Sequence, residues 1–220
     1  MALIRIIDGT GRHSDPWHPF HETTPAIART LAEAGYQVDV RDAEPDAISD
    51  LAGVDVLVVN AGGGTDPRHP LPTPPEWAEA YDRLGEWADS HPILAIHTGI
   101  NAFRDWDRWF EICGGTWVPG VSSHPERSLA VFEPMPGAEK HPILDGLDRV
   151  IAYDERYWKI DVHDGITPVL MHETSDVIYP VVWVAPSGRA IYDALGHMGR
   201  TYESADRRRL LTNEVAYLLG

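Results

Sequence analysis

Residues 93–101, Ile-Leu-Ala-Ile-His-Thr-Gly-Ile-Asn, form an apolar run that stops abruptly at a histidine. Four apolar residues end at His97, and Thr98 and Gly99 follow at once, which is typical of a strand that breaks sharply into a helix. Such an elbow lifts one side chain clear of the sheet edge and leaves backbone N–H groups nearby for an oxyanion. We therefore expect His97 to stand at a functional site; the alternative is a core histidine bonded to a carbonyl.

Apolar runs before this elbow predict an α/β domain. Strands are expected at residues 3–7, 38–40 and 54–59, the last nearly continuous in apolar residues as buried parallel strands are. Helices are expected to open at Thr24-Pro25 and at Thr73-Pro74, because proline at the first helical position is a common helix start. This alternation predicts a three-layer, flavodoxin-like α/β domain with a mainly parallel sheet and helices on both faces.

The second half of the chain is more irregular. Short strands are expected at residues 128–132, 150–153, 169–171, 181–184 and 190–192, and a terminal helix at 203–219. Because we find no repeat, low-complexity tract or linker, we expect residues 1–220 to form a single domain in which this half extends the sheet. Ligands of such sheets bind beyond the carboxyl ends of the strands.

Composition argues against several classes of partner. The formal net charge of −16 disfavours nucleic acid, because binding a polyanion relies on clustered Lys and Arg. No segment approaches the roughly 18 apolar residues of a membrane helix, and the first residues lack the pattern of a signal peptide. We therefore expect a cytoplasmic protein that binds neither nucleic acid nor membrane, and the sequence leaves a homo-oligomer open. The single cysteine, Cys113, excludes an internal disulfide and a Cys-x-x-Cys metal site.

The loops expected at the carboxyl edge are rich in side chains that bind metals or transfer protons. They contain His21, Asn60, His97, His124, Asp154, Glu155, Tyr157 and His197. Imidazole suits proton transfer at neutral pH, and it is a common metal ligand. Because adjacent residues of an extended strand point to opposite faces, Asp154 and Glu155 are not expected to enter the same site. The glycine run at residues 62–64 lacks the surroundings of a phosphate loop, so we interpret it as a flexible turn.

Several short motifs also occur in a specific order along most of the chain. They are Ala95-Ile96-His97-Thr98-Gly99, Ile112-Cys113-Gly114-Gly115, His124-Pro125, His141-Pro142-Ile143, Asp154-Glu155-Arg156-Tyr157, Pro180-Val181-Val182-Trp183-Val184 and Leu195-Gly196-His197. In this order they resemble the ThuA-like family, named for trehalose utilisation, which shares the class I glutamine amidotransferase-like fold. The resemblance implies an association with sugar metabolism and no cysteine nucleophile, since amidotransferases carry cysteine where this elbow carries His97.

Three functions remain open. The first is a small-molecule enzyme acting on a sugar or sugar derivative, with His97 and Glu155 as its catalytic residues. Its predicted substrate-binding residues are His21, Asn60, Asp154 and Tyr157. A divalent metal such as zinc would be bound by His97, His124 and His197.

The second function is a non-catalytic module that binds a small sugar-like ligand by stacking tryptophan side chains on it. Trp17, Trp106, Trp117 and Trp158 are the candidates. The third is an amidohydrolase or amidotransferase, which needs a thiolate at the elbow. Cys113 lies too late in the sequence for that role, and its apolar neighbours indicate a buried structural thiol.

Overall fold

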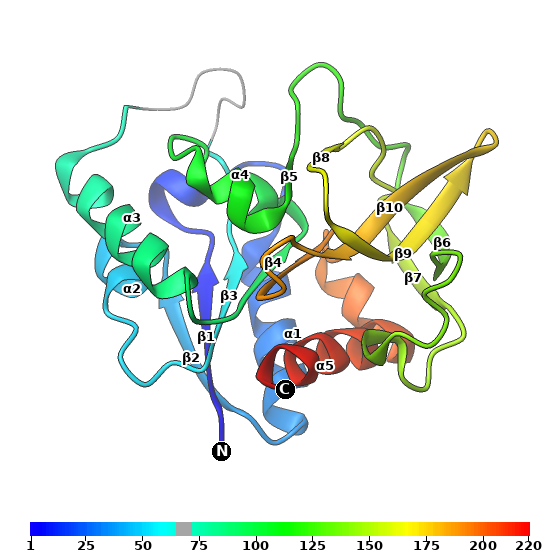
Figure 1. Cartoon of the computed structure of the whole chain (residues 1–220), viewed down its shortest axis with the longest axis horizontal. Coiled ribbons are helices and arrows are strands. Elements are labelled where there is room, and N and C mark those ends of the chain that lie inside the picture. The colour runs from blue at the N-terminus through cyan, green and yellow to red at the C-terminus, as the bar shows by residue number, and fades with distance from the viewer. Residues whose placement is uncertain (65–71) are drawn as a thin grey trace.

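The strands on either side of the elbow lie parallel in one half of a nine-stranded sheet (Figure 1). The computed structural model describes residues 1–64 and 72–220. The parallel strands, in spatial order, are β2 (Gln37–Asp42), β1 (Leu3–Asp8), β3 (Val56–Asn60), β4 (Ile93–Ile96) and β11 (Ala190–Asp193). Strands β3 and β4 are buried along their whole length, which explains their continuous apolar sequence.

The second half of the chain extends this sheet, as predicted, but with antiparallel strands. They follow β11 in the order β10 (Val177–Val184), β9 (Thr167–Thr174), β6 (Ser128–Pro134) and β7 (Val150–Asp154). A separate two-stranded sheet pairs β5 (Gly115–Thr116) with β8 (Asp161–Val162). The predicted fold class is confirmed, with a mixed sheet whose parallel strands carry the elbow.

Helices cover both faces of the sheet (Figure 1). Helix α1 (Phe20–Glu33) packs beside α5 (Ala205–Leu219), and the other face carries α2 (Pro45–Ser49), α3 (Pro75–Ala88) and α4 (Arg108–Cys113). Short 3-10 helices are η1 (Gly11–His13), η2 (His97–Asn101), η3 (Pro142–Leu144) and η4 (Gly199–Glu203). These layers place the ends of β1, β4 and β11 along one edge of the sheet.

The start of α1 was predicted wrongly. The helix begins at Phe20, not at Thr24-Pro25, and Pro25 lies inside it. The Phe20 ring packs against the chain at Gly9, where an added Cβ would approach the ring to 2.6 Å. This apolar anchor fixes the first turn, and Pro25, in the second turn, has no N–H to donate to the His21 carbonyl. The start of α3 was predicted to within one residue, since Pro74 is its N-cap.

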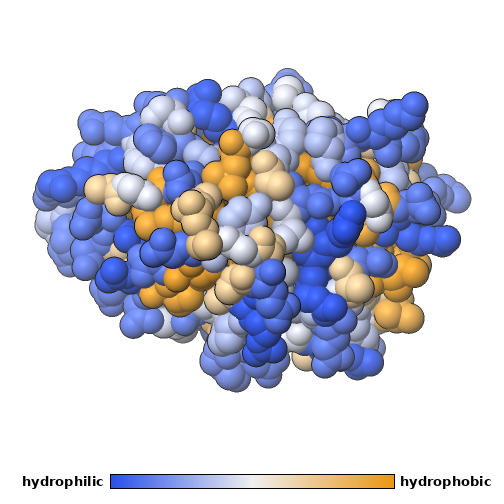
Figure 2. Space-filling view, turned by 90° about the horizontal axis from the view of Figure 1, so that it is seen from below, coloured by the Kyte–Doolittle hydropathy of each residue, from blue (hydrophilic) through white to orange (hydrophobic). Residues whose placement is uncertain are grey.

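The surface is mainly hydrophilic on the face drawn in Figure 2, with smaller hydrophobic areas between polar side chains. None of the helices in the described ranges combines the length and the apolar character needed to span a membrane.

Candidate functional site

The backbone turns sharply after β4, as the sequence predicts, but the His97 side chain is 1% exposed and is not lifted clear of the sheet edge; its burial and its bond to a carbonyl match the alternative, a core histidine. His97 follows β4 directly and has a φ of 52°, a left-handed conformation that is uncommon outside glycine. Two residues later, a Cβ on Gly99 would come within 2.5 Å of the Val59 carbonyl oxygen, so only glycine fits there. Strained backbone of this kind costs about 1–3 kcal/mol and is concentrated at functional sites.

The ring of His97 is oriented by hydrogen bonds on both of its nitrogens. Its Nδ1 lies 2.7 Å from the carbonyl oxygen of Ala194 and therefore carries the proton. Its Nε2 accepts a hydrogen bond of 2.8 Å from the Tyr157 hydroxyl and lies 3.2 Å from Nδ1 of His197. Burial is the main cause that holds the pKa of His97 well below its usual value, and the charges of the nearby His18 and His197 lower it further. His97 is therefore a neutral imidazole whose Nε2 lone pair faces the site.

His18 reaches the same point from the loop after β1. Its Nδ1 lies 2.8 Å from both carboxylate oxygens of Asp15, so the neutral ring carries its proton on Nδ1 and leaves the Nε2 lone pair toward the site. Asp15 also accepts the backbone N–H groups of Trp17 and His18, so the carboxylate fixes the turn as well as the ring. A Cβ on Gly62 would come within 2.3 Å of Asp15 Oδ2, so this part of the glycine run makes room for Asp15.

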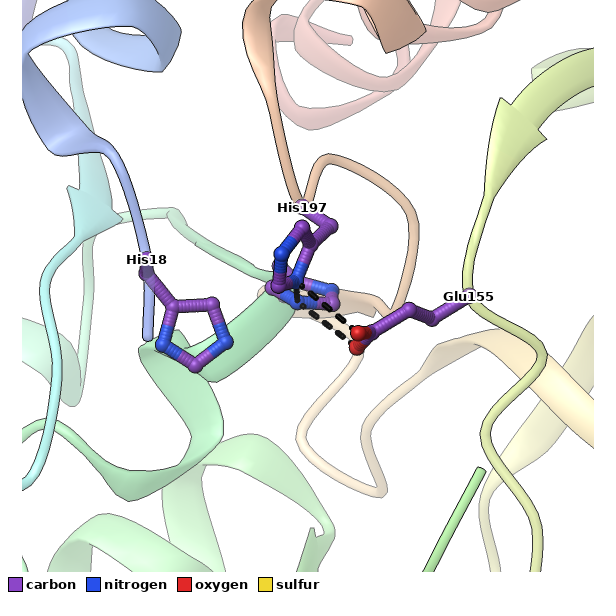
Figure 3. Close-up of side chains that lie close together, drawn as sticks. His18, Glu155 and His197 are labelled. Atoms are coloured by element: carbon purple, nitrogen blue, oxygen red, sulfur yellow. Dashed lines mark hydrogen bonds and ion pairs between the residues drawn. The ribbon is translucent and has the colours of Figure 1, made fainter. Parts of the chain in front are cut away.

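Glu155 lies opposite His18, with His197 between them (Figure 3). One carboxylate oxygen, Oε1, is 3.2 Å from Nδ1 of His197. The other, Oε2, is 3.6 Å from Nε2 of His97, and it is buried without a hydrogen-bond partner in the described part of the chain. A buried carboxylate oxygen without a partner is rare in proteins and points to a ligand or an ion at that position.

Asp154 faces away from Glu155, as the alternation of an extended strand predicts. Its carboxylate accepts the backbone N–H groups of Gly196 at 2.7 Å and of His197 at 3.2 Å. Burial raises the pKa of Asp154 to about 6. Asp154 therefore positions the loop that carries His197, and the described pocket lining does not include it.

These groups lie in and beneath a cavity of about 390 Å³ at the carboxyl edge of the sheet. Its lining consists of Asp15, Trp17, His18, Gly63, Gly64, Thr98, Asn101, Arg104, Trp117, His124, Arg127, Glu155, Tyr157 and His197. His97 lies directly below this lining and is 1% exposed. His124 stands further out, with its side chain 37% exposed and its Nδ1 3.5 Å from Glu155 Oε1.

The structure brings together most of the predicted residues. His97, His124, Glu155, Tyr157 and His197 converge at this cavity. Three of the four predicted substrate-binding residues, His21, Asn60 and Asp154, lie outside the described lining. The His21 side chain is 82% exposed, because it lies in the first turn of α1 and faces solvent. The Asn60 amide is buried and donates to the Thr23 and Thr24 hydroxyls of α1.

From the loop after β1, His18 lines the cavity, and the predicted His21 does not. The sequence feature that could have identified His18 is Asp15, three residues before it. At this spacing the carboxylate can cap the turn and bind the imidazole ring. Four residues, His18, His97, Glu155 and His197, each offer one ligand atom, and these atoms all lie within 4.8 Å of one another. His124 is outside this set, so the geometry favours a different group of metal ligands from the predicted one.

Comparison with known proteins agrees with this fold. The family model for ThuA, described as trehalose utilisation, matches residues 9–218. The chain belongs to the ThuA family. No curated protein matches the chain.

Solved structures share the fold of this ThuA-family protein at low identity. A protein of Parabacteroides merdae described as ThuA-like is 16% identical, with a TM-score of 0.79 over 99% of this chain and 90% of that one. A second, from Bacteroides uniformis, is also 16% identical, with a TM-score of 0.73 over 99% and 91%. A glutamine amidotransferase of Thermotoga maritima is 12% identical, with a TM-score of 0.55 over 99% and 98%.

Cys113 lies in the core rather than at the elbow. It is 1% exposed, and Trp183 Nε1 donates to its backbone carbonyl at 2.8 Å. Burial raises the pKa of the thiol well above its usual value, which disfavours the nucleophilic thiolate. The amidotransferase-like fold thus carries His97 where a thiol mechanism would need cysteine.

Proposed function

We propose that this ThuA-family protein is a metal-dependent enzyme that acts on a sugar or sugar derivative. The observation that carries the proposal is the convergence of one ligand atom each from His18, His97, Glu155 and His197 within 4.8 Å. Three imidazole nitrogens and one carboxylate oxygen form a donor set that suits zinc and related divalent ions.

The surroundings of these residues also fit a metal site. Histidines that bind metals usually donate their other ring N–H to a carboxylate or a backbone carbonyl. His18 does so to Asp15 at 2.8 Å, and His97 does so to the Ala194 carbonyl at 2.7 Å. Both rings are therefore held with Nε2 toward the site, and the unpartnered Oε2 of Glu155 lies on the same side.

A divalent ion at this position would polarise a substrate oxygen or lower the pKa of a bound water to about 7. With Oε2 of Glu155 as the ligand atom, Oε1, the oxygen that His124 contacts, would accept the proton that the reacting hydroxyl loses. His124 contacts Glu155 from the mouth of the cavity and is partly exposed, so it can transfer that proton to solvent. Burial, and next to it the charge of Glu155, raises the pKa of Tyr157, which keeps its hydroxyl protonated and able to donate a hydrogen bond.

The cavity has the size and walls that a sugar needs. Its volume of about 390 Å³ lies within the range of small-molecule sites, and Trp17 and Trp117 contribute aromatic surface to its lining. Trp17 is 52% exposed, so much of its ring is available to a ligand. The other two predicted stacking residues lie outside the described lining. The Trp106 ring stacks on the Tyr81 ring with 5.2 Å between their centroids, and the Trp158 ring lies near that of Tyr179.

Metal content and metal titration test the proposal. Protein purified without an affinity tag is expected to contain about one divalent ion per chain. Glu155→Gln should lower zinc affinity at least about tenfold, because it removes a charged ligand. Glu173→Gln is the matched control, since Glu173 is exposed on β9, outside the cavity lining. An apoprotein that binds no divalent ion would contradict the proposal.

Catalysis is tested separately by incubating the metal-loaded protein with neutral and acidic sugars, including trehalose, and following them by NMR. Conversion that stops on chelation and returns with added metal is the expected result. Protein that binds these sugars and leaves all of them unchanged would instead favour the non-catalytic sugar-binding module, whose aromatic walls are the same.

A further inference from the structure

Arg127 lies at the mouth of the cavity without a carboxylate partner in the described part of the chain. It is exposed, and its Nη1 lies 2.8 Å from Nε2 of His197. A guanidinium whose hydrogen-bond partner is an imidazole and not a carboxylate is unusual in a protein with a formal net charge of −16. The carboxylates of the lining are already engaged, Asp15 by His18 and Glu155 by His197.

The contact with Arg127 fixes the proton of His197. A guanidinium only donates hydrogen bonds, so Nε2 of His197 accepts and a neutral ring must carry its proton on Nδ1. That Nδ1 is the atom that faces His97 Nε2 and Glu155 Oε1, each at 3.2 Å. A protonated Nδ1 has no lone pair for a metal, so Arg127 in this position opposes coordination by His197.

We propose that Arg127 binds an oxyanion of the substrate, a carboxylate or a phosphate, and that this frees His197 to bind the metal. The inference rests on the proposed function and names its substrate class, an acidic sugar derivative. The planar guanidinium matches such groups with two parallel hydrogen bonds. Once Arg127 turns to the anion, the His197 proton can move to Nε2 and leave the Nδ1 lone pair to the metal.

A second guanidinium supports an anionic ligand. Arg104 also lines the cavity, where it crosses Gly63 so closely that a Cβ on this glycine would come within 2.3 Å of Arg104 Cδ. The glycine run, interpreted from sequence as a flexible turn, therefore admits the Arg104 side chain to the cavity. Arg104 and Arg127 bring two guanidinium groups to a cavity that also holds the carboxylates of Asp15 and Glu155.

Isothermal titration of the zinc-loaded protein tests the ligand class with D-glucuronate, D-glucose 6-phosphate and D-glucose. We expect at least one acidic sugar to bind about tenfold or more tightly than glucose, the usual gain from a charge-assisted hydrogen bond. The acidic sugar that is preferred distinguishes carboxylate from phosphate. Arg127→Met should abolish the preference, and Arg149→Met, at an exposed arginine outside the lining, should retain it.

Zinc titration of the apoprotein tests the coupling. The preferred acidic sugar should raise zinc affinity in the wild type, whereas Arg127→Met should bind zinc more tightly without sugar and gain nothing from it. Equal binding of glucose and both acidic sugars, or an undiminished preference in Arg127→Met, would overturn the inference while zinc binding still supports the proposed function. Failure of the wild type to bind zinc would contradict the proposed function itself.

Discussion

The parallel and antiparallel halves of the sheet contribute different kinds of side chain to the site. His18, His97 and His197 follow the parallel strands β1, β4 and β11, and their side chains are at most 14% exposed. His124 and Arg127 precede the antiparallel strand β6 and are far more exposed.

The orientation of the rings differs in the same way. His97 and His18 are each held by a second partner. Among the described residues, Nδ1 of His124 contacts the adjacent Pro125 carbonyl and, more weakly, Glu155. Buried, oriented imidazoles are suited to binding an ion, and exposed groups are suited to meeting substrate. Under the proposed function, the parallel half would supply most of the metal ligands, and His124 and Arg127 of the antiparallel half would meet the substrate together with Trp17. Glu155 would join the two halves.

The largest expected effect comes from His97→Asn. Asparagine tolerates the left-handed backbone at this position, so the elbow can keep its shape where alanine would add strain. We expect zinc affinity to fall by at least about 100-fold, because a ring that is already oriented and neutral is lost. The lost hydrogen bond to Ala194 should lower the free energy of unfolding by about 1–3 kcal/mol.

Thermal unfolding and zinc titration on one sample separate the two roles of His97. The comparison predicts that His124→Asn, the matched change in the antiparallel half, leaves zinc affinity within a few fold. A His97→Asn protein that melts much earlier and still binds zinc normally would show that His97 is a core histidine and no part of the metal site.

A smaller effect is expected from Asp15→Asn, which acts on the metal through His18. The asparagine oxygen can still accept the backbone N–H groups of Trp17 and His18, so the turn should survive. The charged hydrogen bond to the ring is lost, and zinc affinity should fall about 10–100-fold. Gly62→Ala should act in the same direction, since its Cβ would displace Asp15. Unchanged zinc affinity in both variants would remove Asp15 from the site.

Elements with a regular hydrophobic pattern could be predicted from the sequence, and the elbow is the best case. An apolar run that ends in His-Thr-Gly is typical of a strand that turns sharply at its end. The close approach of Gly99 to the Val59 carbonyl explains why glycine is needed there. The opposite directions of Asp154 and Glu155 likewise follow from strand geometry alone. The antiparallel order of β10, β9, β6 and β7 does not follow, because the sequence of a short alternating strand does not specify which strands pair with it.

The choice between His18 and His21 could not be made from spacing. Both follow the first strand, and only the structure shows that Asp15 turns one ring inward while α1 carries the other to the surface. Arg127 was missed because its position depends on the fold of an irregular loop that joins the two halves. Irregular backbone decides where such side chains point, and local sequence specifies it weakly.

The smallest expected effect comes from Cys113→Ala, which tests whether the cysteine thiol takes part in the reaction. Cys113 is buried on α4, and its thiol pKa is raised by burial, so we expect zinc affinity and sugar conversion to stay within a few fold. Removing the sulfur from a packed core should lower the free energy of unfolding by about 1 kcal/mol, as the loss of one methyl-sized group does. Activity and unfolding are to be measured on the same preparation. A folded Cys113→Ala protein that binds zinc and converts no sugar would reinstate a thiol mechanism and remove the parallel-strand histidines from the chemistry.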